Sequence, residues 1–205
     1  MESVELDGAA KQARTANGGV SAPRIVLCTG GYTGALAPKT RRAVLPIATY
    51  MMLSEAAPDL IASAIHTTEA VLDDRRASDY YRVVDGGKRL LWGGRITTRA
   101  ASSAGIAREL RREMIGAYPQ LRDLATEISW SGQTGYARHL MPQIGEMRPG
   151  VWHATAFGGH GLNTTAIAGK LLAEAILGQS DRIAMFKPFG LDWAGGPIGL
   201  AAAQL

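Results

Sequence analysis

Long apolar runs are absent from this sequence of 205 residues, and residues 1–20 lack the apolar core of a signal peptide. No stretch approaches the roughly 20 apolar residues that a membrane-spanning helix needs. We therefore expect a protein that works in the cytoplasm without a membrane partner. The polar, glycine-containing segment before Pro23 and the other end of the chain are expected to be loosely ordered.

Cysteine is also scarce, because Cys28 is the single one in the chain. One cysteine excludes an internal disulfide framework and a structural zinc site built from cysteines. The four histidines, His66, His139, His153 and His160, are far apart and lack the spacing of metal ligands. The sequence therefore predicts no metal site and fits a reducing compartment.

Aromatic residues make up 6% of the chain, and the basic residues are scattered although the net charge is +4. Basic pairs such as Arg41-Arg42 and Arg111-Arg112 are not interleaved with aromatic side chains, as a single-strand binding surface would require. Binding to nucleic acid is a minor alternative that would show as steep salt dependence. We expect no nucleic-acid partner. The sequence also lacks the glycine-serine elbow of serine hydrolases and the phosphate-binding P-loop.

What the sequence does contain is enough apolar material, 46% of its residues, for one good-sized domain or two small ones. Short apolar runs predict strands at 24–31, 44–53, 125–132 and 151–157. Residues 79–84 and 89–94 flank a turn rich in Asp and Gly, which predicts a β-hairpin. The fold class is therefore α/β (α+β), with an antiparallel sheet.

Two helices follow from the spacing of apolar residues. Ile106, Leu110 and Met114 recur every four positions, which predicts an amphipathic helix from Ser103 to a stop near Pro119. A second helix is expected to begin at a cap formed by Asn163 or Thr164 and to end at Gly178.

The second helix follows the glycine-rich loop of the stretch ATAFGGHGLNTT, residues 154–165. Gly158, Gly159 and Gly161 leave the backbone bare just where unpaired helix amides favour an electron-rich ligand group. A tight packing turn between strand and helix explains the same glycines, and both interpretations stay open at this point. His160 is either a structural histidine or a proton-handling group.

Five segments together resemble a known family: RIVLCTGGYTG, RRAVLPIATY, DYYRVVDGGKRLLWGGR, MPQIGEMRPGVWHATAFGGHGLNTT and PFGLDWAGGPIGLAAAQ. In this order and spacing they resemble the carboxyl-terminal half of FAD-dependent amine and amino-acid oxidoreductases of the D-amino-acid oxidase type. The likeness is greatest to the gamma-glutamylputrescine oxidase branch, and it extends from about Val20 onward. The resemblance implies FAD as cofactor and oxidation of a carbon–nitrogen bond in an amine or amino acid.

The resemblance also implies the roles of particular residues. Segments 1–43 and 151–205 correspond to parts of a Rossmann-like FAD-binding domain, and 44–150 to an antiparallel-sheet substrate domain with a helix. Tyr50 and Arg82 are candidates for the substrate side, and no catalytic residue is assigned. The following residues correspond to cofactor-binding positions of the family: Thr29, Gly30, Gly31, Gly158, Gly159, His160, Gly161, Leu162 and Asn163.

The family's amino-terminal GxGxxG strand-turn-helix, its main FAD anchor, has no counterpart in this sequence. We therefore expect a truncated chain, a fragment or one half of a split enzyme, whose partners are a small amine or amino-acid substrate and an amino-terminal half of the same enzyme. The alternative is a non-catalytic fragment or interaction module of such an enzyme.

Overall fold

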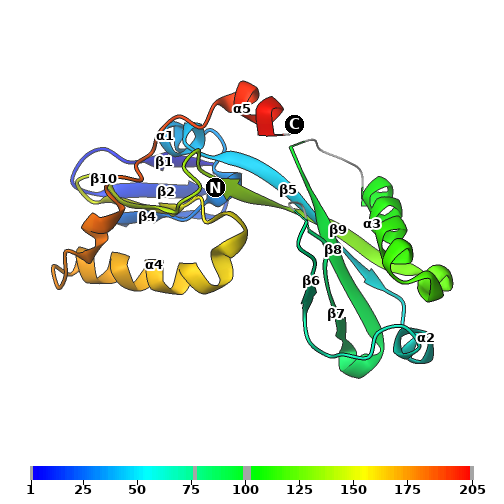
Figure 1. The fold of residues 1–205 in the computed structure, drawn as a ribbon. Helices are drawn as coiled ribbons and strands as arrows, with labels where there is room; N and C mark the ends of the chain where they lie inside the picture. The colour runs from blue at the N-terminus through cyan, green and yellow to red at the C-terminus, as the bar shows by residue number, and fades with distance from the viewer. Residues whose placement is uncertain (1, 76–77, 99–102, 204–205) are drawn as a thin grey trace. The chain divides into compact units, whose positions relative to one another are not determined.

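The computed structural model describes residues 2–75, 78–98 and 103–203, and its contacts divide the chain into two compact units. Figure 1 labels the elements of both. The first unit comprises residues 1–47 and 133–205, and the second comprises residues 48–132. The predicted substrate segment 44–150 therefore overlaps both units.

The first unit contains a three-stranded sheet in the order β10 (Gln143–Arg148), β11 (Val151–Thr155) and β4 (Ile25–Leu27). β10 and β11 are antiparallel, whereas β11 and β4 are parallel, with His153 opposite Leu27. The other edge of β4 has no strand beside it in the described part of the chain. The predicted strand at 24–31 is thus shorter than expected, because its glycines turn into a 3-10 helix, η1 (Gly30–Tyr32).

α4 (Gly161–Ile176) packs on one face of this sheet through Ala168 and Leu172, which belong to the same apolar cluster as residues of β10 and β11. The helix ends where predicted. Gly178 has φ +68° and its amide donates to the Ala175 carbonyl at 3.1 Å, so a glycine in the left-handed region terminates the helix.

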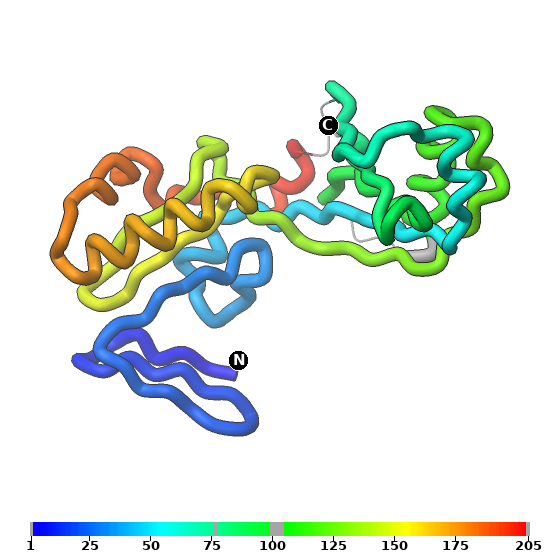
Figure 2. The backbone as a smooth tube through the Cα atoms, turned by 90° about the horizontal axis from the view of Figure 1, so that it is seen from below, coloured from blue at the N-terminus to red at the C-terminus, as the bar shows by residue number. Residues whose placement is uncertain are grey.

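The start of the chain forms a second sheet of three antiparallel strands (Figure 2). These strands are β1 (Ser3–Glu5), β2 (Lys11–Thr15) and β3 (Gly18–Ala22). The expectation of a loosely ordered start is therefore wrong. Two residues, Ala16 and Asn17, connect Thr15 to its partner Gly18 in a tight hairpin turn.

The rest of the first unit consists of short helices. They are α1 (Pro38–Arg42), η4 (Gly158–His160), η5 (Arg182–Phe186) and α5 (Gly196–Ala203). In the described residues no helix is long and apolar enough to cross a membrane.

The second unit contains a five-stranded sheet in the order β6-β7-β8-β5-β9, and the strands β5 and β9 also include residues that belong to the first unit. Its strands are β6 (Val71–Leu72), β7 (Tyr80–Val84), β8 (Arg89–Thr97), β5 (Leu45–Ser54) and β9 (Thr126–Tyr136). The pairs β6–β7, β7–β8 and β8–β5 are antiparallel. The predicted hairpin is confirmed as β7 and β8, and its turn places Asp85, Gly86 and Gly87 at positive φ.

α3 (Ser103–Ala117) covers one face of that sheet, as the apolar spacing predicted. Ile106, Leu110 and Met114 are each at most 4% exposed. They pack in one core with Trp92 of β8, on which the ring of Tyr81 stacks at a centroid distance of 4.2 Å. Three short helices complete the unit: α2 (Pro58–Ala62), η2 (Asp85–Gly87) and η3 (Pro119–Asp123). The chain thus has the predicted mixture of helices and antiparallel sheet.

Candidate functional site

A cavity of about 430 Å³ lies in the first unit where β4, β9 and β11 end and α4 begins. Strand ends and helix N-termini are where α/β folds bind ligands, since backbone groups there lack partners within the element. The lining residues are Cys28 to Tyr32, Gln133 to Gly135, Ala154 to Gly158, Gly161, Thr165, Gly169 and Leu172.

The N-terminus of α4 is not closed by a side-chain cap. His160 occupies the cap position, and no side chain accepts a hydrogen bond there in the described structure. The predicted cap by Asn163 or Thr164 is wrong, because the helix begins earlier, at Gly161. The Thr164 hydroxyl instead donates to the His160 carbonyl at 2.6 Å, one turn back along the chain. The first amides of α4 thus keep the partial positive charge of a helix start.

Glycines shape the cavity wall because side chains would not fit. A Cβ atom on Gly135 would stand 2.8 Å from Cγ1 of Val44, and one on Gly31 would stand 3.0 Å from Cβ of Gln133. Gly158 has φ +58°, and a Cβ atom on it would stand 3.0 Å from Cε1 of the Tyr136 ring. Bare backbone is therefore required on both sides of the cavity.

The cavity wall also contains a buried hydroxyl without a partner. Thr155 is 1% exposed, and its Oγ1 atom has no hydrogen-bond partner in the described structure. The nearby Thr29 hydroxyl, by contrast, lies 2.7 Å from that of Thr33. An unsatisfied buried hydroxyl costs about 1–3 kcal/mol, which a polar ligand group would offset. The bare backbone of the cavity glycines, the uncapped N-terminus of α4 and the unpaired hydroxyl of Thr155 together fit a cofactor such as FAD.

The structure brings together some of the predicted cofactor residues and not others. Those that line the cavity are Thr29, Gly30, Gly31, Gly158 and Gly161. Those that do not line it, and are exposed, are Gly159, His160, Leu162 and Asn163. The sequence reasoning missed the contributions of Cys28, of residues 133–135 and of Thr155. Gly135, a glycine inside a strand, was the one local signal for them.

The two predicted substrate residues lie on opposite faces of the second unit's sheet. Tyr50 is 1% exposed and belongs to the core that packs against α3. Arg82 of β7 is exposed and lies opposite Leu91 of β8 in the strand pairing. Its neighbour Tyr81 packs against the core. Since side chains alternate along a strand, Arg82 points away from that core.

The face of the sheet that carries Arg82 also presents two hydroxyl groups. Thr49 Oγ1 and the Tyr80 hydroxyl are 2.9 Å apart. Gly93 lies beneath the Tyr80 ring, because a Cβ atom there would stand 2.2 Å from ring Cε2. Arg82 Nε donates to the Thr68 carbonyl at 3.2 Å, and no carboxylate pairs with this guanidinium in the described residues. This face combines a cation with hydroxyl donors and acceptors.

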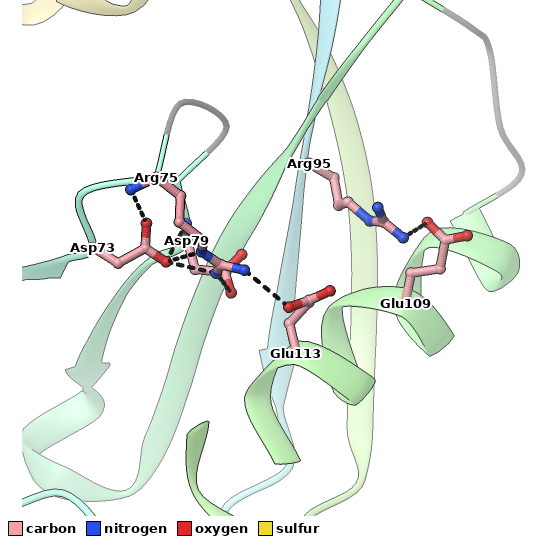
Figure 3. A network of polar contacts seen from close by, with 6 residues as sticks. All are labelled: Asp73, Arg75, Asp79, Arg95, Glu109 and Glu113. Atoms are coloured by element: carbon pink, nitrogen blue, oxygen red, sulfur yellow. Dashed lines mark hydrogen bonds and ion pairs between the residues drawn. The ribbon is translucent and has the colours of Figure 1, made fainter. Parts of the chain in front are cut away.

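Acidic residues gather around Arg75, beside α3 (Figure 3). The guanidinium contacts Asp73 and Asp79 at 2.6 Å each and Glu113 at 3.2 Å. Hydrogen bonds from Arg75 lower the pKa of Asp73, whereas burial raises the pKa of Asp79 despite the same partner. The single positive charge of Arg75 offsets only part of the negative charge of these three carboxylates. Among the described residues, no three His, Cys, Asp or Glu side chains form a metal-binding group.

Comparison with known proteins gives relatives for most of the chain. The probable oxidoreductase OrdL of Rhizobium meliloti is 31% identical over 187 residues, which are 90% of this chain and 42% of that protein. The gamma-glutamylputrescine oxidoreductase of Escherichia coli is 29% identical over 175 residues, 84% of this chain and 41% of that protein. The chain spans about two fifths of the length of these curated relatives.

Solved structures share the fold. The glycine oxidase from Geobacillus kaustophilus superposes with a TM-score of 0.74 at 21% identity, covering 93% of this chain and 50% of that one. The L-proline dehydrogenase from P. horikoshii has a TM-score of 0.70 at 17% identity, covering 92% of this chain and 52% of that one.

The model of one family, described as DAO, FAD dependent oxidoreductase, matches residues 1–175. That match includes the glycines on both sides of the cavity, from Gly30 to Gly161, and every strand of the second unit's sheet. FAD is the cofactor of the family. The chain therefore belongs to the DAO family of FAD-dependent oxidoreductases.

Proposed function

We propose that this chain forms the carboxyl-terminal part of an FAD-dependent oxidoreductase that acts on the carbon–nitrogen bond of an amine or amino acid, similar to gamma-glutamylputrescine oxidoreductase. The observation that carries the proposal is the cavity of about 430 Å³ at the uncapped N-terminus of α4. The likeness to the Escherichia coli enzyme supports the substrate class.

In this proposal the backbone holds the cofactor from two sides. Gly158 and Gly161 would face the ring system at the start of α4, and the partial positive charge of the helix start would stabilise its electron-rich edge. Thr29, Gly30 and Gly31 would hold the pyrophosphate and adenosine portion, and the Thr155 hydroxyl would donate to a polar cofactor atom. His160 is exposed and contributes its backbone to the loop. Bound FAD supplies the acceptor for a hydride from the substrate carbon.

Substrate orientation is assigned to the face of the sheet that carries Arg82. The guanidinium attracts the carboxylate of an amino-acid substrate, and the paired hydroxyls of Thr49 and Tyr80 accept from or donate to its amine. Tyr50 supports β5 from the core face, because a ring that is 1% exposed cannot reach a ligand on the other face. The chain's own task is to orient the substrate and exclude water.

The proposed macromolecular partner is an amino-terminal half of the same enzyme. It would add a strand to the free edge of β4 and contribute the GxGxxG turn that this sequence lacks. Leu162 and Ile167, which are 98% and 59% exposed on α4, offer apolar surface for it. We place the complex in the cytoplasm, because a chain with one cysteine lacks the disulfide framework that is common in small secreted domains.

Co-expression tests this proposal. The chain is produced together with the residues of Escherichia coli gamma-glutamylputrescine oxidoreductase that precede its matching region. We expect the two chains to purify together as a yellow complex whose flavin is bleached by an amine substrate without oxygen. A colourless complex, or a chain that does not quench FAD fluorescence up to high micromolar concentrations, would favour the alternative of a non-catalytic fragment or interaction module. That alternative is supported by the open β4 edge, which invites pairing with a second copy.

A further inference from the structure

The side chain of Tyr80 crosses one whole strand of the second unit's sheet. Tyr80 belongs to β7, and its hydroxyl lies 2.9 Å from Oγ1 of Thr49, which belongs to β5. The strand order places β8 between these two strands. Two strand spacings of about 4.7–4.9 Å each therefore separate the two backbones. The phenol leans across β8 instead of standing upright on its own strand.

Gly93 of β8 makes this crossing possible. It lies directly opposite Tyr80 in the pairing of β7 with β8, and directly opposite Met51 in the pairing of β5 with β8. A Cβ atom on Gly93 would stand 2.5 Å from Cζ of the Tyr80 ring, and closer still to ring Cε2 and to Sδ of Met51. The ring edge and the thioether thus occupy the space that a side chain at position 93 would fill.

Gly94, the next residue of β8, serves a different neighbour. Successive residues of a strand face opposite sides of the sheet, so the bare position at Gly94 lies on the other face. A Cβ atom there would stand 3.3 Å from Cγ of Asp79, whose carboxylate pairs with Arg75. Of the two glycines, Gly93 is the one that concerns the face with Arg82.

The hydroxyls of Tyr80 and Thr49 form one hydrogen-bonding unit. One of them donates its hydrogen to the other, which leaves the unit a single outward hydrogen and the remaining oxygen lone pairs. The internal hydrogen bond also polarises both groups. A Tyr80 ring displaced from Gly93 would separate the hydroxyls, and each would then offer its hydrogen and lone pairs in another direction.

We propose that Gly93 is a positioning residue for the substrate amine. By leaving room for the Tyr80 ring beside Met51, it holds the hydroxyls of Tyr80 and Thr49 together as the group that receives the amine nitrogen. This inference rests on the proposed function, in which that pair of hydroxyls binds the amine. Gly93 acts through Tyr80 and does not itself contact the substrate.

The kinetic test uses the complex with the amino-terminal half and gamma-glutamylputrescine as substrate. We expect Tyr80→Phe and Gly93→Ala each to raise KM about fivefold, the effect of one lost hydrogen bond, with kcat within about twofold of its native value. The double variant Gly93→Ala/Tyr80→Phe should show no further rise, because both changes remove the same interaction. Gly116→Ala is the control, since no atom lies within 4 Å of the Cβ position of this α3 glycine.

Two NMR measurements on the chain alone test the positioning whether or not Gly93→Ala folds. In the unmodified protein the Tyr80 ring protons should show nuclear Overhauser effects to the Gly93 α-protons and to the Thr49 methyl group. Thr49→Val should move the carbon resonance of Tyr80 Cζ, the ring atom that bears the hydroxyl, because the hydroxyl loses its partner.

The inference would be overturned by an unchanged KM in Gly93→Ala, by a further rise in the double variant, or by missing Overhauser effects between Tyr80 and Gly93. A complex that oxidises no amine would instead contradict the proposed function. In that case the NMR measurements would still decide whether Gly93 positions the hydroxyl pair, so the two failures are distinguishable.

Discussion

The phenol ring of Tyr136 lies against the backbone of Gly158, so that a Cβ atom added at Gly158 would stand 3.0 Å from ring Cε1. Gly158 also has φ +58°, a conformation that costs other residues about 1–2 kcal/mol. The contact with Tyr136 and the positive φ of Gly158 together fix the turn that leads from β11 into α4. The direction of the helix amides toward the cavity depends on this turn.

Replacing Gly158 by alanine is therefore expected to damage the cofactor site. The variant Gly158→Ala should lose about 1–2 kcal/mol of unfolding free energy and at least about tenfold in FAD affinity. Gly178→Ala is the matched control, because Gly178 has φ +68° but no atom within 4 Å of its Cβ position. It should show a similar loss in urea unfolding with unchanged FAD binding. Equal effects of both variants on flavin fluorescence would contradict the role given to Gly158.

Arg75 should matter more for stability than Arg95. Both guanidinium groups are about half exposed, but Arg75 pairs with Asp79, whose side chain is 7% exposed, whereas Arg95 pairs with Glu109, which is 44% exposed. Arg75→Met leaves a buried carboxylate without its cation, and we expect a loss of about 1–2 kcal/mol in urea unfolding. For Arg95→Met we expect less than about 1 kcal/mol. A reversed order would show that the Arg75 cluster does not stabilise the second unit.

His153 should make stability depend on pH below neutrality. Burial, with Lys39 nearby, lowers the pKa of His153 from 6.5 to about 4. Between these values the unfolded chain binds a proton that the folded chain does not, so stability is full above pH 6.5 and is lost as the pH falls toward 4. The loss attributable to this residue is about 3 kcal/mol.

The measurement is the pH dependence of urea unfolding in the native chain and in His153→Leu. The difference between the two slopes isolates His153 from the carboxylates, which titrate in both proteins. Parallel curves would contradict the assignment. An NMR titration of the native imidazole gives the same pKa without a variant.

Cys28 should react slowly with alkylating reagents at neutral pH. Partial burial raises the pKa of its thiol above the ordinary value, and the thiolate is the reactive form. The rate of alkylation by iodoacetamide should therefore rise with pH through a midpoint higher than that of the same protein unfolded in guanidinium chloride. Because the chain has one cysteine, the reaction reports on this site alone. A midpoint equal to that of the unfolded chain would show that partial desolvation does not raise the pKa of this thiol.

Local chemistry made several elements of the fold predictable. The Asp85-Gly86-Gly87 turn forces positive φ and so marks the hairpin, and Gly178 marks the end of α4 because few other residues adopt its conformation. The four-residue spacing of Ile106, Leu110 and Met114 predicted α3, because it places these apolar side chains on one face of a helix. The hairpin at Ala16-Asn17 was not predicted, because its turn lacks two residues that favour positive φ and its strands are polar and give no apolar alternation.

The candidate site was predictable only in part, because residues distant in the sequence build it. Gly158 was found through the glycine-rich loop and Gly30 and Gly31 through the family resemblance, and all three line the cavity. Gln133 and Thr155 join them through strand packing, which no local pattern encodes. The start of α4 was misplaced because Asn163 and Thr164 have the composition of a cap, while the preceding 3-10 turn extends the helix to Gly161.

The central claim, that FAD occupies the cavity between the Cys28–Gly31 segment and α4, is tested most directly by alkylation of Cys28 with and without FAD. Cys28 lines the cavity and is exposed to solvent. We predict that increasing FAD slows the reaction in a saturable way, and that Gly158→Ala shifts this protection to higher FAD concentrations while Gly178→Ala does not. An alkylation rate that stays the same up to millimolar FAD, in the chain alone and in its complex with an amino-terminal half, would contradict the account.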